Sequence, residues 1–409
     1  MTELAEALAR RTEALCARLS PIGHEREIAD DVEAWARPRF QRVERISNSV
    51  VIHVDAIPPL PVVGGDPIPP LPIVVRGDPI PPLPVVARGD PIPPLPPAAP
   101  GGEGRGEGGR PRPLVALCGH LDTVPVHDED RGPPRREGGR LVAPGASDMK
   151  GGVAVMMELA ERLPRERRFC DLVLVLYARE EGPYVENELA EVLRDPARLG
   201  RPDLALCLEP TDNVLQLGCV GSIHGTFTFA GRAAHSARPW HGENAVHRAG
   251  ALLVDLAGRA PREARSGGQV YREVLSATRI EGGRARNVVP DRCAVNVNFR
   301  FAPDKSLEAA ADELRALAAR HGAEVELTDL SPACPAFGDH PLVRRLVERT
   351  GVGVEPKQAW TDVARLAAYG IPAANLGPGA TSQAHQRGEW VELDALAKGY
   401  ALYERFLTP

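Results

Sequence analysis

Five side chains of the kinds that bind divalent metals lie at or just after apolar runs of the sequence. They are His120, Asp148, Glu181, Glu209 and His385, and Glu180 stands directly before Glu181. In open α/β sheets, ligands bind outside the carboxyl ends of the strands, so side chains at those ends face one crevice. A pair of divalent ions about 3.5–4 Å apart can clamp the attacking and leaving oxygens of a hydrolytic displacement. Such a pair needs a bridging carboxylate and an imidazole or carboxylate on each ion, and these five side chains suffice for it.

Each of these residues also has an ordinary structural interpretation. Asp148 lies in the glycine-rich turn GASDMKGG that opens a predicted helix, where an acidic N-cap is common. His385 could be a turn residue in its Gly/Ser/Thr-rich loop, and the adjacent carboxylates Glu180 and Glu181 would be commonplace on a solvated loop. Glu209 follows the apolar run LALCL and is harder to explain in this way. The joint placement of the set at strand ends is what favours a metal site.

Two further residues lie next to His120. Asp122 follows it in the pattern His-x-Asp and can accept the second ring N–H, which fixes the tautomer of a metal-bound histidine. Cys118 precedes it in the pattern Cys-x-His, but a cysteine in an apolar strand behaves as a small buried hydrophobe, and we favour that interpretation. Glu180 and Glu181 are neighbours that point in different directions, so one can bind metal while the other addresses the attacking water.

Composition narrows the classes of function. The 409 residues carry a net charge of −6 with a pI near 6.0, which gives no basic field for nucleic acid or an anionic membrane surface. No apolar run approaches the ~20 residues of a membrane span, and the charged, amphipathic N-terminus predicts a first helix instead of a signal peptide. The seven cysteines are widely scattered, as is typical of reduced thiols in the cytoplasm. We therefore expect a cytoplasmic protein whose ligands are small molecules.

A proline-rich repeat interrupts the sequence between Asp55 and Pro113. Four copies, from DAIPPLPVVGG to DPIPPLPPAAPG, are followed by the linker-like stretch GGEGRGEGGRPRP. Proline at this density predicts extended polyproline II units in a disordered insert. The strand-like runs that end at Val54 and start at Leu114 could pair as a hairpin whose loop has been expanded. The repeats could bind proline-recognising modules, although we favour a passive surface loop.

Alternation of strand-like and helical segments predicts an α/β catalytic domain in two pieces, 1–217 and 331–409. Helices are expected on both faces of its sheet, because continuous apolar strands are typical of sheets covered on both sides. The first piece is expected to contain strands at 114–118, 171–177 and 204–208 and a helix at 149–163.

The pattern changes over 218–330, which predicts a second domain inserted into the first. Its segments follow the order β-α-β-β-α-β, the ferredoxin-like unit. The expected strands are 222–230, 273–281, 292–301 and 324–328, and the expected helices are 243–259 and 306–320.

Motifs along the chain resemble those of a known family. GHLDTVPV, GASDMKGG, YAREEG, LEPT, GRAAHSARP, RNVVPD and PGATSQAH occur in family order. They resemble the zinc-dependent family of acetylornithine deacetylase, succinyl-diaminopimelate desuccinylase, aminoacylase and glutamate-releasing carboxypeptidases. The resemblance spans nearly the whole chain except the proline-rich insert, which is not expected in the family. The stretches HSARPWHGENAVHR and WTDVARLAAYGIPAANLGPG look most like the succinyl-diaminopimelate desuccinylase branch.

The resemblance implies a zinc-exopeptidase-like catalytic domain with a mixed sheet flanked by helices, and an inserted lid and dimerisation domain. It also implies two Zn²⁺ per subunit, for which Co²⁺ or Mn²⁺ could substitute because the ligand types overlap. One ion would be bound by His120, Asp148 and Glu209. The other would be bound by Asp148, Glu181 and His385, so that Asp148 bridges the pair.

The resemblance assigns three further features to the site. Glu180 would be the general base; Asp122, which the His-x-Asp pattern assigns to orient His120, is counted with it among the catalytic residues. A cis peptide would follow Asp148. His235, in the inserted domain of a homodimer, would reach the active site of the other subunit and stabilise the tetrahedral oxyanion.

The implied reaction is hydrolysis of N-succinyl-LL-2,6-diaminopimelate, an anionic N-acyl amino acid, to succinate and LL-2,6-diaminopimelate in lysine and diaminopimelate biosynthesis. Water activated at the metal pair would attack the amide. Arg300 lies on the polar face of its strand and could clamp a substrate carboxylate, with Arg238 and Asn287 as further substrate-binding residues; a solvated strand arginine is the alternative.

Three other functions stay open. Acetylornithine deacetylase, or a related N-acyl-amino-acid amidohydrolase, uses the same chemistry on another acyl group. A metallo-exopeptidase would act on dipeptides. A non-catalytic scaffold, which uses the proline-rich repeats to bind partners, belongs to a different class.

Overall fold

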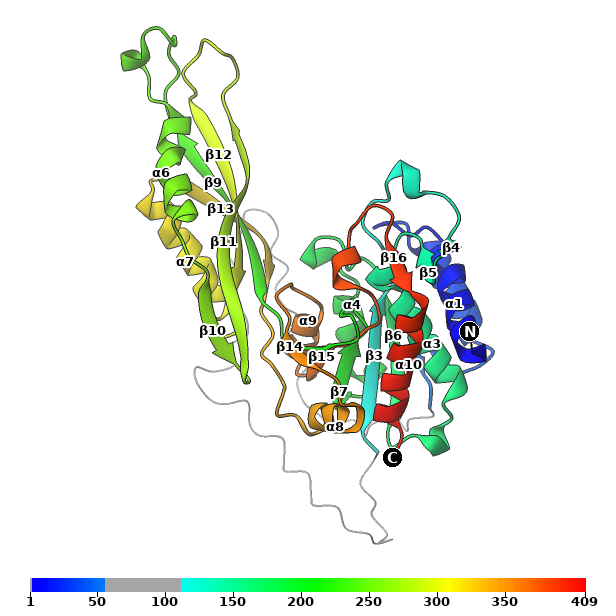
Figure 1. Cartoon of the computed structure of the whole chain (residues 1–409). Coiled ribbons are helices and arrows are strands. Elements are labelled where there is room, and N and C mark those ends of the chain that lie inside the picture. Colours follow the sequence, from blue (N-terminus) through cyan, green and yellow to red (C-terminus); the bar gives the residue numbers. More distant parts are fainter. Residues whose placement is uncertain (1, 56–111) are drawn as a thin grey trace.

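Two sheets organise the structure, a computed structural model that describes residues 2–55 and 112–409. An eight-stranded mixed sheet with helices on both faces forms the larger unit, and a five-stranded antiparallel sheet forms an elongated unit beside it (Figure 1). The predicted α/β class, with a mixed sheet flanked by helices, is confirmed. Within the described residues, no helix is long and apolar enough to cross a membrane.

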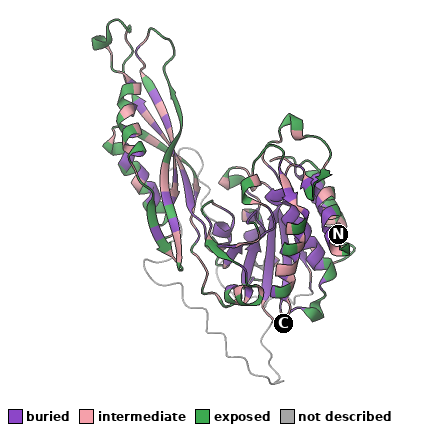
Figure 2. Cartoon of the chain, in the orientation of Figure 1, coloured by how far each residue is buried: buried purple, intermediate pink, exposed green. Residues whose placement is uncertain are grey.

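The larger sheet has the order β1-β2-β6-β3-β7-β15-β8-β14. Its strands are β1 Arg42–Ile46, β2 Ser49–His53, β6 Asp171–Tyr177, β3 Leu114–His120, β7 Leu204–Cys207, β15 Ala373–Asn375, β8 Leu215–Leu217 and β14 Val354–Pro356. β3 pairs in parallel with both β6 and β7. Every residue of these three strands is buried (Figure 2), as expected of continuous apolar runs covered on both faces.

Side chains of the central strands alternate between two hydrophobic cores, one on each face of the sheet. The first core packs against α1 Glu3–Cys16, α2 Arg26–Ala36, α3 Gly151–Arg162, α8 Pro341–Thr350 and α10 Leu393–Leu407. The second packs against α4 Leu189–Leu193, α5 Pro196–Leu199 and α9 Val363–Ala368. The predicted N-terminal helix is present, and so is the helix expected at 149–163, which begins at Gly151.

A small third sheet was not predicted from the sequence. It has the order β16-β5-β4, with β16 Trp390–Glu392, β5 Arg140–Val142 and β4 Arg135–Glu137. Strands of three residues are too short for a period of two to stand out from the background. The pairing brings the segment around Glu389 against the turn that precedes α3.

The elongated unit contains the predicted β-α-β-β-α-β order. Its elements are β9 Gly221–Ala230, α6 Ala245–Ala257, β10 Arg262–Ser266, β11 Gln269–Gly282, β12 Arg292–Phe301, α7 Leu307–Arg320 and β13 Glu324–Ser331. The sheet order is β10-β11-β12-β9-β13. β10 is an edge strand that we did not predict, because its sequence REARS is charged and mostly exposed. Both helices pack on the apolar face of the sheet, and the other face is polar.

The predicted hairpin between the strands that flank the proline-rich insert is wrong. β6 lies between β2 and β3, antiparallel to the first and parallel to the second. The prediction assumed that strands adjacent in sequence pair with each other. Here β3 is followed by the crossover helix α3, which returns the chain to place β6 in the intervening position.

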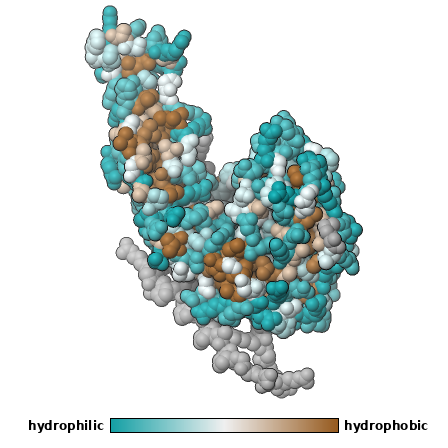
Figure 3. All heavy atoms as spheres, viewed as in Figure 1, coloured by the Kyte–Doolittle hydropathy of each residue, from teal (hydrophilic) through white to brown (hydrophobic). Residues whose placement is uncertain are grey.

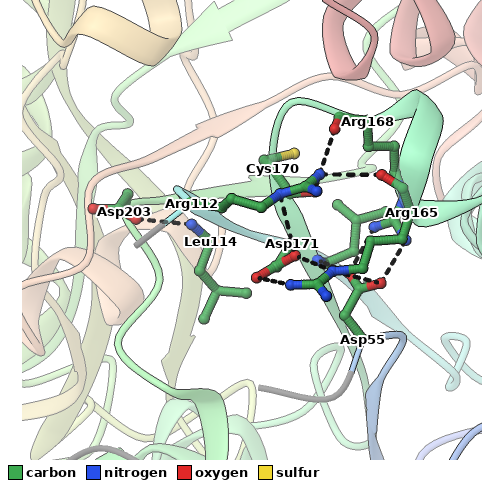
Figure 4. A network of polar contacts seen from close by, with 9 residues as sticks. Asp55, Arg112, Leu114, Arg165, Arg168, Cys170, Asp171 and Asp203 are labelled. Carbon is green, nitrogen blue, oxygen red and sulfur yellow. Dashed lines mark hydrogen bonds and ion pairs between the residues drawn. The ribbon is translucent and has the colours of Figure 1, made fainter. Parts of the chain in front are cut away.

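The two ends of the insert belong to the folded structure, whereas 56–111, with nearly all of the predicted polyproline and linker sequence, lie outside the described residues. Asp55 is only 6% exposed and accepts hydrogen bonds from Arg168 Nη1 and Nη2 at 2.8 and 2.7 Å (Figure 4). Arg112 donates to the main-chain oxygens of Arg165, Arg168 and Cys170. The boundaries drawn at Asp55 and Pro113 therefore included residues that anchor the sheet.

Replacing Arg168 by methionine should destabilise the protein by about 3–5 kcal/mol, because the buried carboxylate of Asp55 then loses both of its charged hydrogen bonds and keeps, of its charged contacts, only the longer ion pair with Arg165, at 3.9 Å. Urea unfolding would measure the change. Arg167→Met is the matched control, since Arg167 is exposed and pairs with Glu404 at the surface. A free energy of unfolding for Arg168→Met equal to that of the control would contradict the anchoring role.

Candidate metal centre

The carboxyl ends of three neighbouring parallel strands bring the predicted ligands together. β3 ends at His120, Glu180 and Glu181 follow β6, and Glu209 follows β7. These strands are adjacent in the sheet order β6-β3-β7, so their ends meet at one edge. His385 comes from the loop after β15, which pairs with β7.

Asp148 lies at the middle of the cluster. His120 Nε2 is 3.2 Å from Asp148 Oδ1, and His385 Nε2 is 3.6 Å from Asp148 Oδ2 and 2.8 Å from Glu181 Oε2. Potential ligand atoms lie within 4.8 Å of one another in three groups. The groups are His120, Asp148 and Glu209; Asp148, Glu181 and His385; and His120, Glu180 and Glu181. The first two are the ligand sets that the resemblance implies, and Asp148 is common to both.

The burial and the mutual repulsion of the carboxylates favour cations in this cluster. Burial, together with the negative charges of Asp148 and Glu181, raises the pKa of Glu209 to about 7. Burial likewise raises the pKa of Glu181, with the charge of Asp148 adding to it. Oε1 of Glu209 is buried and has no hydrogen-bond partner. A divalent cation would satisfy this oxygen and relieve the repulsion between the carboxylates, so the donor set of imidazole and carboxylate fits such an ion.

The role predicted for the carboxylate of Asp122 needs correction. His120 Nδ1 lies 3.0 Å from the main-chain oxygen of Asp122 and 3.7 Å from its carboxylate, so the hydrogen bond to the ring goes to the main chain. The carboxylate instead accepts the main-chain N–H groups of Glu180, at 3.1 Å, and Glu181, at 2.9 Å. Asp122 thus orients the imidazole through its backbone and the two glutamates through its side chain.

The N-cap interpretation of Asp148 is wrong, since the first turn of α3 has no side-chain cap. The Asp148–Met149 peptide bond is cis, as the resemblance implies. The backbone of this turn is held by Glu389, whose carboxylate accepts the N–H groups of Gly145, Ser147 and Asp148 at 2.7–2.8 Å. Glu389 is 6% exposed, and burial together with the charge of Asp148 raises its pKa to about 7. Sequence reasoning missed it, because GEWVE carries no motif.

A cavity of about 340 Å³ opens beside the cluster and is lined by both units of the structure. The larger unit contributes Glu180 and Lys357, and the elongated unit contributes Arg300. Of the residues predicted to bind substrate, Arg300 therefore lines the cavity beside the candidate metal centre. Lys357 and Trp360 also line the cavity and were not singled out from the sequence.

His235, Arg238 and Asn287 lie elsewhere. All three are exposed, in the loops that join β9 to α6 and β11 to β12, at the end of the elongated unit far from the large sheet (Figure 1). They lie close together there: Ser236 N–H donates to Asn287 O at 3.0 Å, and Arg238 N–H donates to His235 O at 2.8 Å. Within one chain, these residues do not line the cavity.

Replacing Glu389 by glutamine should weaken metal binding by about 10- to 100-fold, because the turn that positions Asp148 loses its charged acceptor. Metal retained after dialysis against graded chelator would give the affinity. Glu392→Gln is the control, since Glu392 ends β16, which begins directly after Glu389, but pairs with Arg140 at the surface. Equal metal affinities of the two variants would rule out the positioning role.

Comparison with known proteins agrees with this architecture. The sequence profile of peptidase family M20/M25/M40 matches residues 116–408. An aminopeptidase from Bacillus cereus (TM-score 0.70, 18% identity) covers 98% of both chains. A metallo-carboxypeptidase of the M20 family from Sulfolobus solfataricus (TM-score 0.68, 15% identity) covers 99% of this chain and 98% of its own. At these identities the structures show a common fold.

Curated relatives are more similar in sequence. A protein of Mycobacterium tuberculosis whose name assigns it as succinyl-diaminopimelate desuccinylase is 41% identical over 72% of this chain and 82% of its own length. Succinyl-diaminopimelate desuccinylase of Corynebacterium glutamicum is 35% identical over 72% of this chain and 80% of its own. Acetylornithine deacetylase of Myxococcus xanthus is 31% identical over 75% and 82%, respectively. With the profile match over most of its length, the chain belongs to peptidase family M20/M25/M40 and is a metal-dependent amidohydrolase.

Proposed function

We propose that this amidohydrolase cleaves the amide bond of N-succinyl-LL-2,6-diaminopimelate to give succinate and LL-2,6-diaminopimelate. The observation that carries the proposal is the identity of 41% and 35% to relatives that bear the name of this activity. The cavity that joins the candidate metal centre to Arg300 supports it, because the substrate carries carboxylates as well as the scissile amide.

The ligand geometry suggests how the site would be used. His120, Asp148 and Glu209 would hold one Zn²⁺, and Asp148, Glu181 and His385 the other. Bound zinc supplies Lewis acidity, which lowers the pKa of the attacking water and polarises the scissile carbonyl. Co²⁺ and Mn²⁺ share these ligand preferences.

Glu180 would act as the general base. Its carboxylate lines the cavity next to the ligand groups, and the carboxylate of Asp122 holds its main chain in place. Burial raises the pKa of Glu180 well above its usual range, and the charges of Glu209 and Glu181 add to this effect. A carboxylate with a raised pKa can take the proton of the attacking water and return it to the departing amine.

Arg300 would bind a substrate carboxylate. Its Nε donates to Asn298 Oδ1 at 3.0 Å, which aims the guanidinium, and no described residue forms an ion pair with it. Burial lowers the pKa of Arg300, although its guanidinium stays charged. The two terminal nitrogens are free to bind a carboxylate in bidentate fashion.

We also propose that the enzyme is a homodimer formed through the elongated unit. β11 pairs with β10 only as far as Glu273, so beyond this point one of its edges has no strand partner among the described residues. Ile280 on this stretch and Val254 on α6 are 50% and 75% exposed, and apolar side chains gather on the surface of the unit (Figure 3). An open strand edge beside exposed apolar side chains favours association of two copies.

In such a dimer, His235 would serve the active site of the other subunit by stabilising the oxyanion. Its exposure, and its position outside the cavity of its own chain, support a role across the interface. Arg238 and Asn287, which lie beside it, would contact the substrate there.

All seven cysteines are buried and free, which supports our proposal of a cytoplasmic enzyme.

The substrate is tested by comparing kcat/KM for N-succinyl-LL-2,6-diaminopimelate and for N-acetylornithine, with zinc added back to chelated enzyme. We expect the succinyl substrate to be preferred.

Glu180→Gln should lower kcat by about 10²–10⁴-fold without loss of metal, because the variant cannot accept the proton. Glu186→Gln, an exposed carboxylate paired with Arg179, is the control.

Preference for acetylornithine would replace the proposed substrate by that of the Myxococcus xanthus relative. Normal turnover of Glu180→Gln would instead rule out the assigned general base. If neither substrate were cleaved by the wild-type enzyme, the remaining alternative would be a dipeptide substrate.

Mixing two inactive variants tests the role of His235 across the interface. His235→Ala and Glu180→Gln should each be inactive, because each lacks one part of every site. Heterodimers combine one intact His235 with one intact Glu180 at a single site, so random exchange of subunits should restore about a quarter of wild-type activity. The absence of recovery in mixtures shown by mass to contain heterodimers would contradict the proposal.

A further inference from the structure

Lys357 is a buried cation in the cavity that no function proposed above uses. It follows directly after β14, at the edge of the eight-stranded sheet, and its main-chain N–H donates to Leu217 O at 3.1 Å. The residue is only 6% exposed and lines the same cavity as Arg300 and the metal-ligand carboxylates. Its ammonium group forms no hydrogen bond or ion pair with any residue of the described ranges 2–55 and 112–409.

The other lysines that are not fully exposed have partners. Lys150 donates to the main-chain oxygen of Arg18 at 2.7 Å, and Lys305 pairs with Glu273 and Glu313. A buried charge without a partner costs several kcal/mol, so it is retained only where something compensates for it. Lys357 has no such anion in direct contact among the described residues, and its ammonium group is not one of the fully buried polar groups without a partner, so it is open to a group that enters the cavity.

The metal-ligand carboxylates do not fill this role once cations are bound. Lys357 interacts with Asp148 and Glu209 over a distance, and its positive charge opposes the rise in the pKa of Glu209. Two divalent ions would neutralise these carboxylates and would themselves repel the ammonium group. The positive charge of Lys357 would then face the cavity without compensation, which favours a substrate group that carries negative charge.

We propose that Lys357 is a specificity-determining residue that binds a carboxylate of the substrate, as a second cationic contact separate from Arg300. The proposal rests on the proposed hydrolysis of an N-succinyl amino acid, whose acyl chain and amino-acid part both carry carboxylates. Arg300 reaches the cavity from β12 of the elongated unit and Lys357 from the edge of the large sheet, so the two cations approach the cavity from different units.

Lys357→Met removes the charge and keeps much of the side-chain length, and Lys357→Arg keeps the charge. We expect Lys357→Met to lower kcat/KM for N-succinyl-LL-2,6-diaminopimelate by about 10- to 100-fold, the usual effect of losing a charged hydrogen bond. Lys357→Arg should recover part of this loss. Lys398→Met is the control, because Lys398 is exposed on α10, outside the cavity.

Two analogues identify the carboxylate. N-acetyl-LL-2,6-diaminopimelate lacks the carboxylate of the acyl chain, and N-succinyl-1,5-diaminopentane lacks those of the amino-acid part. The ratio of wild-type to Lys357→Met kcat/KM should fall to near one for the analogue that lacks the group bound by Lys357, and should stay high for the other. An equal loss on all three substrates, or no loss on any of them, would overturn the proposal.

Two measurements without turnover separate recognition from a structural role. The metal content and the melting temperature of Lys357→Met should be no lower than those of the wild type, since the replacement removes a buried positive charge close to the metal ligands. Loss of metal or of stability would overturn the proposal in favour of a structural role. Calorimetric titration with succinate should show weaker binding to the variant if the acyl carboxylate is the one recognised.

Activity of the wild-type enzyme tests the proposed function separately from the role of Lys357. If the wild type cleaves acetyl but not succinyl substrates, the succinyl assignment fails. Lys357 is then tested by the loss of kcat/KM in Lys357→Met, which should be present with N-acetyl-LL-2,6-diaminopimelate and absent with N-acetyl-1,5-diaminopentane. A loss that persists on both acetyl compounds would overturn the role of Lys357 as well.

Discussion

The structure depends on holding several carboxylates close together at the carboxyl ends of buried central strands. Asp148, Glu181 and Glu209 share this edge with two imidazoles, and burial raises the pKa of Glu181 and Glu209. Water screens their repulsion only weakly there, so the arrangement is unfavourable unless cations occupy it. The centre of the sheet imposes this arrangement. The strands β3, β6 and β7 are parallel, fully buried and adjacent, so the residues at their carboxyl ends lie side by side.

Hydrogen bonds from the main chain to two carboxylates position the residues that follow the strands or lie outside them. Asp122 holds the Glu180–Glu181 backbone, and Glu389 holds the turn that carries Asp148. Both are buried carboxylates that accept N–H groups, and neither belongs to the candidate ligand groups. Rigid support of this kind matters because a ligand displaced by a fraction of an ångström no longer fits the coordination distances of the ion.

The sequence predicted the parts of the site that depend on local pattern. His120, Glu181 and Glu209 follow apolar runs that can only be buried strands, and parallel strands bring their ends to one edge. The hairpin around the insert was wrong because strand order depends on crossover connections, which leave no trace in either strand. The hydrogen bonds of Asp122 and Glu389 could not be predicted, since a carboxylate whose N–H donors are far away in the sequence cannot be told from an exposed Asp or Glu by its sequence. Lys357 was missed for the same reason: only the fold shows that it is buried beside the cavity.

The cavity is formed by two units whose own cores are separate, and this has a consequence for recognition. The large sheet supplies the candidate metal ligands and Lys357, while the elongated unit supplies Arg300. If Arg300 and Lys357 bind carboxylates as proposed, a substrate with a single negative charge would satisfy only one of the two cations and would leave the other without a partner. A substrate with carboxylates on both sides of its amide can satisfy both cations while the amide lies at the metal centre. Discrimination against neutral acyl chains would then come from the cost of leaving a buried charge unpaired, a larger effect than the contact energy of a few methylene groups.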